Sequence, residues 1–81
     1  MGRFYFHLRV GDEVIPDEEG LDLPDVSVAQ REAVRSAREL LAEAIRAVQP
    51  RPPDAVVIAD EAGRMLGTIP LASVLPQSLK R

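Results

Sequence analysis

Polar and apolar residues alternate along residues 3–10, the first patterned stretch of the chain. The apolar positions are Phe4, Phe6, Leu8 and Val10, and the positions between them are Arg3, Tyr5, His7 and Arg9. A period of two with several aromatic residues is typical of a β-strand that buries one face. Gly-Asp at 11–12 is a turn dipeptide. A second short strand over residues 13–15 is therefore expected to pair back on the first.

An acidic segment with proline at its start and glycine at its end interrupts the strands at residues 16–20. Proline removes a backbone donor and Gly20 can adopt a positive φ, so a turn is expected here. Residues 21–23, Leu-Asp-Leu, alternate again and predict a short third strand, which Pro-Asp at 24–25 ends.

The longest amphipathic pattern runs over residues 26–48 and predicts a helix. At about 100° per residue, its apolar side chains fall on one broad arc. These side chains are Val26, Ala29, Ala33, Val34, Ala37, Leu40, Leu41, Ala44, Ile45 and Val48. Asp25 or Ser27 can cap the N-terminus, and Ser27 with Gln30 would form a capping box. The helix is expected to stop before Pro50, because proline cannot continue it.

A second hairpin is expected after the helix. Residues 55–59 are apolar and β-branched, which predicts a strand. Residues 60–63 predict a four-residue loop with Gly63 in the left-handed conformation. The partner strand over residues 64–71 contains Pro70, so it is expected to be an edge strand or to end there.

The order β-β-(β)-α-β-β predicts an α+β fold, in which a small antiparallel sheet carries one long amphipathic helix on one face. Residues 1–81 form a single domain, with an ordered core over about residues 3–75. One helical turn is expected at residues 72–75, and a polar tail occupies residues 77–81. The order of the strands in the sheet is left open.

Composition limits the possible functions. The chain has 81 residues, no cysteine and a formal net charge of −3. It therefore has no disulfide or thiolate metal site, and a general nucleic-acid-binding role is disfavoured. No apolar stretch approaches the length of a membrane span or signal peptide, so a cytoplasmic protein is expected. Nine of the ten basic residues are arginine, which indicates a GC-rich, bacterial coding sequence.

His7, the only histidine, allows two interpretations. It could act as a general base with Asp17, Glu18 or Tyr5 nearby. Alternatively, it is a strand histidine that faces the surface and bonds to a neighbour across the sheet. We favour the second interpretation, and we predict no catalytic residue, cofactor or metal site.

Charged residues of the helix and of the segment before it also allow two interpretations. Four arginines form a stripe beside three glutamates: Arg31, Arg35, Arg38 and Arg46, and Glu32, Glu39 and Glu43. The stripe could bind phosphates or the acidic segment of a second copy, or it could be a solvated helix face with weak ion pairs. The acidic residues 12–25 could bind a cation or a basic partner, but we favour turn chemistry and the helix dipole as their explanation.

Four segments together resemble a family of short bacterial proteins that is catalogued only as a domain of unknown function. They are Arg-Phe-Tyr-Phe-His-Leu-Arg at 3–9, Ile-Pro-Asp-Glu-Glu-Gly at 15–20, Leu-Pro-Asp at 23–25, and Asp-Glu-Ala-Gly-Arg at 60–64 with Thr-Ile-Pro-Leu at 68–71. This resemblance implies no established activity and no catalytic residue.

A looser resemblance, over residues 5–44, is to HicB-type antitoxins. They also open with an aromatic strand, an acidic turn with glycine and a Leu-Pro-Asp-like step before a helix rich in Ala and Glu. The chain lacks their second aromatic strand and an added DNA-binding segment. The resemblance implies a regulator that binds a small protein toxin or, less readily, nucleic acid.

From the residues themselves we predict a non-enzymatic protein-interaction domain that self-associates as a homodimer. One helix can cover only one face of the predicted sheet, and the other face is left for a partner. The candidate interaction surface consists of Tyr5, His7, Arg31, Arg35 and Arg38.

Overall fold

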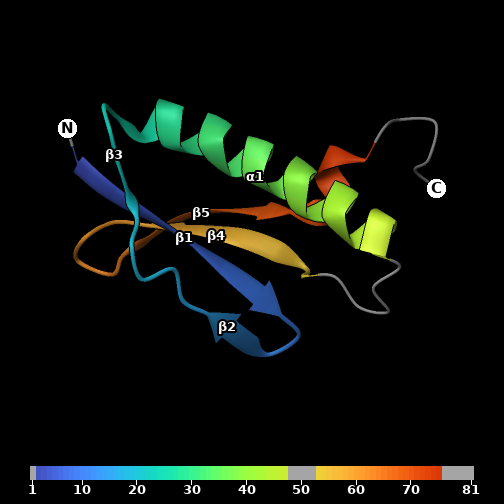
Figure 1. Cartoon of the computed structure of the whole chain (residues 1–81). Helices are drawn as coiled ribbons and strands as arrows, with labels where there is room; N and C mark the ends of the chain where they lie inside the picture. Colours follow the sequence, from blue (N-terminus) through green and yellow to red (C-terminus); the bar gives the residue numbers. More distant parts are fainter. Residues whose placement is uncertain (1, 48–52, 76–81) are drawn as a thin grey trace.

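The computed structural model describes residues 2–47 and 53–75 and confirms the predicted α+β fold (Figure 1). The elements in chain order are β1 (Gly2–Val10), β2 (Glu13–Ile15), β3 (Leu21–Leu23), α1 (Val26–Ala47), β4 (Ala55–Ala59), β5 (Met65–Pro70) and the 3-10 helix η1 (Leu71–Val74). The third strand and the helical turn near residue 72 were expected, and both are present. Val48, Pro50 and the tail at residues 77–81 lie outside the described residues.

The sheet has the strand order β2-β1-β4-β5, and every pair is antiparallel. The long strand β1 has β4 on one side. On its other side, residues 8–10 pair with β2 and residues 2–4 pair with β3. The two short strands therefore share one edge of β1, with the acidic turn between them. Sequence periodicity left this strand order open, because it does not reveal which strands are neighbours.

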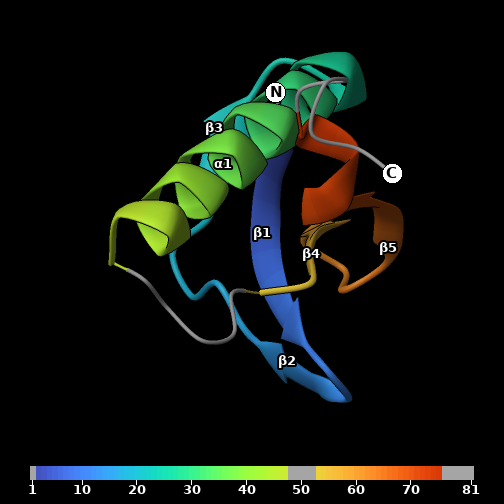
Figure 2. The same ribbon diagram turned by 90° about the vertical axis from the view of Figure 1, so that its right-hand side faces the viewer.

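Helix α1 lies across one face of the sheet, and η1 packs beside it on the β5 side (Figures 1 and 2). The core between the two layers is built from Phe4, Ala29, Ala33, Ala37, Val56, Ile58 and Leu71. Phe6 and Leu8 pack against this core from β1, and Leu40 and Leu41 do so from α1. The apolar flank of the helix thus meets the Phe4–Phe6–Leu8 side of β1, as the alternating pattern predicts.

The helix buries a narrower stripe than its apolar arc suggests. Its buried residues are Ala29, Ala33, Ala37 and Ala44, whose small side chains allow the helix to approach the sheet closely. Val26 and Ile45 belong to the apolar arc but are 41% and 65% exposed.

The helix N-terminus is capped by Asp25, one of the two expected caps. Its Oδ1 accepts a hydrogen bond from the N–H of Val28 at 3.0 Å. The helix already begins at Val26, so Ser27 lies inside it and the described side chains form no capping box with Gln30. An aspartate in this position satisfies one of the free N–H groups and places negative charge at the positive end of the helix dipole.

The second hairpin turns as expected. Gly63 has φ +83, and its N–H donates to the carbonyl of Asp60 at 3.0 Å. Asp60 Oδ1 also accepts from the N–H groups of Ala62 and Arg64. These hydrogen bonds, first that from the Arg64 N–H, hold the pKa of Asp60 below its usual value. Strand β5 is an edge strand and it ends at Pro70, so both features expected from Pro70 are present.

Candidate functional site

The sheet face opposite α1, called the outer face below, is crossed by three rows of paired residues. The rows are Tyr5–Ala59–Met65, His7–Val57–Thr68 and Arg9–Ala55–Pro70. Val14 of β2 extends the third row, because it pairs with Arg9. Neither α1 nor η1 covers this face, since both lie on the other side (Figure 2), and the acidic turn borders it beside Tyr5 and His7. The residues of β4 in these rows are buried, because Ala55, Val57 and Ala59 are 0%, 5% and 2% exposed, so the accessible side chains of the outer face lie on the flanking strands.

Tyr5 and His7 lie side by side on the outer face, as expected from their alternation. Their rings are stacked, with centroids 6.2 Å apart and planes inclined by 18°. His7 Nδ1 accepts a hydrogen bond from the backbone N–H of Asp17 at 2.9 Å. The favoured interpretation placed His7 on the surface, bonded to a neighbour across the sheet. His7 is half-buried, and its bonding partner is the backbone of the acidic turn beside β1.

Asp17 fills the gap between β2 and β3 along the edge of β1. Its Oδ2 accepts from the N–H of Phe6 at 3.1 Å, and its Oδ1 accepts from Glu19 and Gly20 in its own turn. Together with the bond to His7, this makes the residue a link between β1 and the acidic turn. The carboxylate thus takes the place of a strand partner that a continuous β2–β3 strand would otherwise supply.

The pKa of Asp17 reflects this role. Partial burial by itself raises the pKa, but the three backbone N–H donors stabilise the charged form, and the nearby imidazole of His7 adds a smaller effect. The result is a pKa below the usual value of 3.8. This carboxylate is therefore ionised at neutral pH and is held by backbone donors.

The contacts of His7 differ from those of a general base that is paired with the Asp17 carboxylate. His7 meets Asp17 through a backbone N–H, and the Asp17 carboxylate points at other backbone N–H groups. Within the described ranges, no three His, Cys, Asp or Glu side chains come together in a way that could hold a metal ion. Both residues hold the acidic turn on the sheet.

The candidate arginines lie on the opposite layer of the molecule. Arg35 bonds to Glu32 and to Glu39, the latter at 3.1 Å, whereas Arg31 and Arg38 border a shallow hollow on α1. Since α1 covers the other side of the sheet, these arginines do not form one surface with Tyr5 and His7. The predicted interaction surface is split into two parts by the sheet itself.

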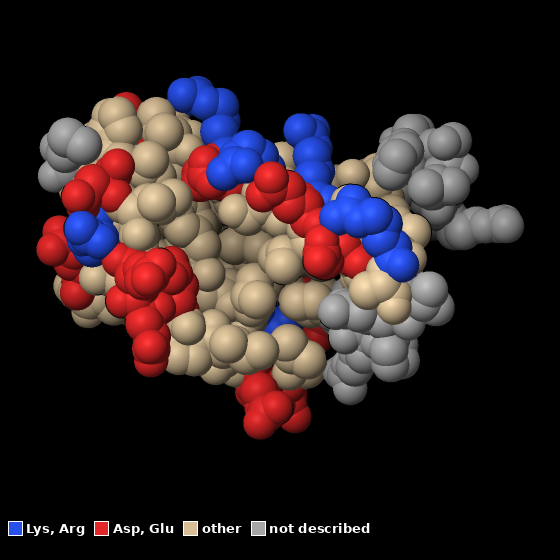
Figure 3. Space-filling model, in the orientation of Figure 1, with Lys and Arg blue, Asp and Glu red and all other residues tan. Residues whose placement is uncertain are grey.

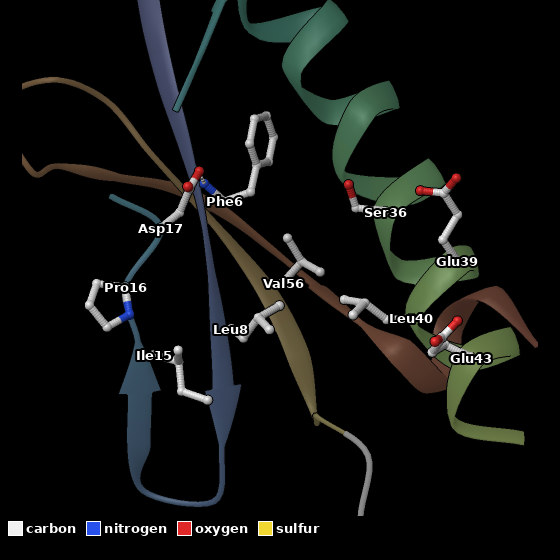
Figure 4. A pocket seen from close by; sticks show the side chains of 10 residues that line it. All are labelled: Phe6, Leu8, Ile15, Pro16, Asp17, Ser36, Glu39, Leu40, Glu43 and Val56. Carbon is white, nitrogen blue, oxygen red and sulfur yellow. Dashed lines mark hydrogen bonds between the residues drawn. The ribbon is translucent and has the colours of Figure 1, made fainter. Parts of the chain in front are cut away.

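The structure adds a feature that sequence reasoning missed, an open groove between the second half of α1 and the β1–β2 hairpin. It encloses about 480 Å³. Its apolar lining consists of Phe6, Leu8, Ile15, Pro16, Leu40 and Val56, and its polar lining consists of Asp17, Ser36, Glu39 and Glu43 (Figure 4). We call it the α1–β2 groove. Ile15 was visible in the sequence only as the end of a three-residue strand, so no local pattern marked it.

Residues 3–72 match the model of a protein family described as a domain of unknown function, DUF6894. The matched range begins in β1 and ends in η1, so it contains every strand and the helix. The chain belongs to the DUF6894 family. This confirms the expected membership of a family of unknown function, and the likeness to HicB-type antitoxins stays a prediction. No curated protein and no solved structure gives a significant match to this DUF6894 domain.

The two candidate surfaces of the DUF6894 domain, the outer face and the α1–β2 groove, lie on opposite sides of the sheet. Among the helices of the described chain, none has both the length and the apolar composition that crossing a bilayer requires. The description of the family assigns no ligand or reaction to either surface.

Proposed function

We propose that this DUF6894 domain is a non-enzymatic protein-interaction domain that forms a homodimer through its outer face. The observation that carries the proposal is that neither α1 nor η1 lies on this face, where exposed side chains surround the buried residues of β4. The exposed side chains are Arg9, Val14, Met65, Thr68 and Pro70. In the three rows of paired residues, Arg9 is the only Asp, Glu, Lys or Arg residue, and the outer face also carries Arg3 and Asp22, which form an ion pair with each other. A surface with so little unpaired charge can face a second copy of itself with little like-charge repulsion.

The outer face also has the composition of an interface. Val57 of β4 lies at its centre, where it is only 5% exposed, and the half-buried rings of Tyr5 and His7 flank it. Apolar side chains remain accessible at its two ends, where Met65 is 67% and Val14 is 54% exposed. An apolar centre with aromatic residues is typical of homodimer interfaces.

The small size of the chain supports the same proposal. A domain of this length buries only about 60–65% of the surface that its unfolded chain exposes. A second copy seated on the outer face would cover Met65 and Val14 and add to a modest core. Each apolar square ångström removed from water contributes about 25 cal/mol.

Sedimentation velocity of the purified chain at micromolar concentrations tests the proposal. We expect a dimer for the unaltered chain. Met65→Glu would place a charge on the outer face of each copy and should shift the equilibrium toward monomer. Ile45→Glu is the control, because Ile45 is as exposed as Met65 but lies on α1, in the opposite layer. A strictly monomeric unaltered chain would contradict the proposal.

An antitoxin-like regulator remains the second prediction, and it rests on the looser resemblance. It requires a small basic protein that copurifies from the native host and a toxin-like gene next to its own. A pull-down with the tagged chain tests for this protein. The absence of both the protein and the gene would rule out the antitoxin-like function.

A further inference from the structure

The hydrophobic core is sealed on one flank and open on the other. On the β5 side, η1 places Leu71 in the core, where it is buried, and Val74 packs beside it. On the β2 side, the described chain has no corresponding element, and the α1–β2 groove opens there. Figure 3 shows the resulting tan hollow beneath the charged side chains of α1.

Large apolar side chains form the floor of this groove. Leu8 and Val56 are paired across β1 and β4, and Ile15 extends the same row because it pairs with Leu8. Leu40 faces this row from the helix (Figure 4). Ile15 is 52% exposed although it lies on the face of the sheet that forms the core. The volume falls in the range of ligand pockets, about 300–1,000 Å³, and would take about one or two large side chains of a partner.

The ionisable residues that line the rim of the groove are all acidic. Its ionisable lining residues are Asp17, Glu39 and Glu43, and no lysine or arginine lines it. In Figure 3, acidic side chains also lie to the left of the hollow and below it. Such a rim favours a positively charged partner and disfavours an acidic one.

Two arginines of α1 neutralise part of this rim. Arg35 bonds to Glu39 at 3.1 Å, and Arg46 bonds to Glu43 at 2.8 Å. All four side chains are well exposed, so these pairs contribute little and can exchange partners readily. A basic partner could therefore bind both glutamates at low cost.

We propose that the α1–β2 groove binds a segment of another protein that presents one or two large apolar side chains between lysines or arginines. The apolar side chains would lie on Leu8, Ile15 and Leu40, and the cations would reach Glu39 and Glu43. This partner differs from the one on the outer face, so the inference goes beyond the proposed function and does not depend on it.

An amide NMR titration of the full chain tests the proposal with a synthetic peptide, Gly-Lys-Lys-Leu-Phe-Lys-Lys-Gly. We expect saturable shifts centred on the amides of Ile15, Leu40 and Glu43. Two matched peptides, one with glutamate for every lysine and one with serine for Leu-Phe, should each bind at least about tenfold more weakly. Equal binding of either matched peptide, or shifts centred outside the groove, would overturn the proposal.

Paired variants of the chain locate the site. Ile15→Ser should weaken binding of the peptide about tenfold. Val14→Ser should leave this binding unchanged, because Val14 is about as exposed as Ile15 but lies on the outer face. Glu43→Lys should likewise weaken binding, whereas Glu61→Lys in the distant hairpin loop makes the same change of charge and should not. If Ile15→Ser instead dissociates a dimer of the chain, the groove holds a second copy and the proposal is wrong.

Discussion

The backbone N–H of Asp17 donates a hydrogen bond to Nδ1 of His7 at 2.9 Å, while the Asp17 carboxylate accepts from the N–H of Phe6 in β1. Two neighbouring residues of β1 are thus bonded to one residue of the acidic turn. This turn separates β2 from β3 along the same edge of β1. Asp17 and His7 therefore fix the position of both short strands, and with them the floor of the α1–β2 groove.

Replacing His7 tests its structural role. His7→Ala removes the acceptor of the Asp17 N–H and the ring that stacks on Tyr5, so we expect a loss of about 1 kcal/mol in the free energy of unfolding. His7→Asn retains a side-chain acceptor and should lose less. Urea denaturation of the three proteins measures the difference. Equal stability of His7→Ala and the unaltered chain would contradict the structural role of His7.

The lowered pKa of Asp17 predicts a dependence of stability on pH. Because its pKa lies below 3.8 in the folded chain, the folded state binds fewer protons on this group than the unfolded state does. Its contribution is complete above the unfolded value and is lost as the pH falls through the folded pKa. The stability difference between the unaltered chain and Asp17→Asn should be largest near pH 7 and shrink below about pH 4.

Urea midpoints measured between about pH 7 and pH 3 check this dependence on Asp17. Glu18→Gln is the control, since it removes a carboxylate from the same turn without removing any of the hydrogen bonds described above. Its midpoint should stay close to that of the unaltered chain at each pH. A constant difference between the unaltered chain and Asp17→Asn over the whole range would show that the Asp17 charge contributes nothing.

Gly20 and Gly63 both have a positive φ, so the effects of replacing each by alanine can be compared directly. At Gly20, with φ +71, an added Cβ would lie 2.9 Å from the carbonyl oxygen of Phe4 and 2.9 Å from Cε1 of Tyr5. At Gly63, with φ +83, an added Cβ meets nothing within 4 Å. We expect Gly63→Ala to cost about 1 kcal/mol from backbone conformation alone, and Gly20→Ala to cost about 1–3 kcal/mol more from the clash.

Thermal unfolding of both glycine variants measures these costs. Equal losses would mean that the acidic turn does not rest on β1 as closely as the structure places it.

The helix cap makes a further prediction. Asp25→Ala should destabilise the chain by about 1 kcal/mol, because the N–H of Val28 loses its acceptor. Ser27→Ala should change the stability little, since Ser27 is exposed and lies within the helix. Chemical denaturation distinguishes the two variants. A larger loss of stability for Ser27→Ala than for Asp25→Ala would indicate that Ser27, with the capping box, caps the helix.

Local patterns were enough to predict most of the fold. The alternation around Phe6 predicted β1 and its buried face, the helical arc predicted α1, and Gly63 marked the second hairpin. These elements depend on residues that are close in sequence, so periodicity and turn chemistry are sufficient to find them.

Features that depend on distant residues were not predictable in the same way. The link between Asp17 and Phe6 depends on which strands share an edge. The split between Tyr5 and Arg35 follows from the helix lying on the other layer. The α1–β2 groove exists only once the row of Ile15 and Leu8 is placed beneath α1, so no single segment signals it.

Sedimentation velocity over a dilution series, with the paired variants Val14→Asp and Ile15→Asp, tests the central claim most directly. These adjacent residues are almost equally exposed but lie on opposite faces of β2. We predict a dimer for the unaltered chain, a shift to monomer for Val14→Asp, and no shift for Ile15→Asp. A monomeric unaltered chain at micromolar concentration, or an equal response of the two variants, would contradict dimerisation through the outer face.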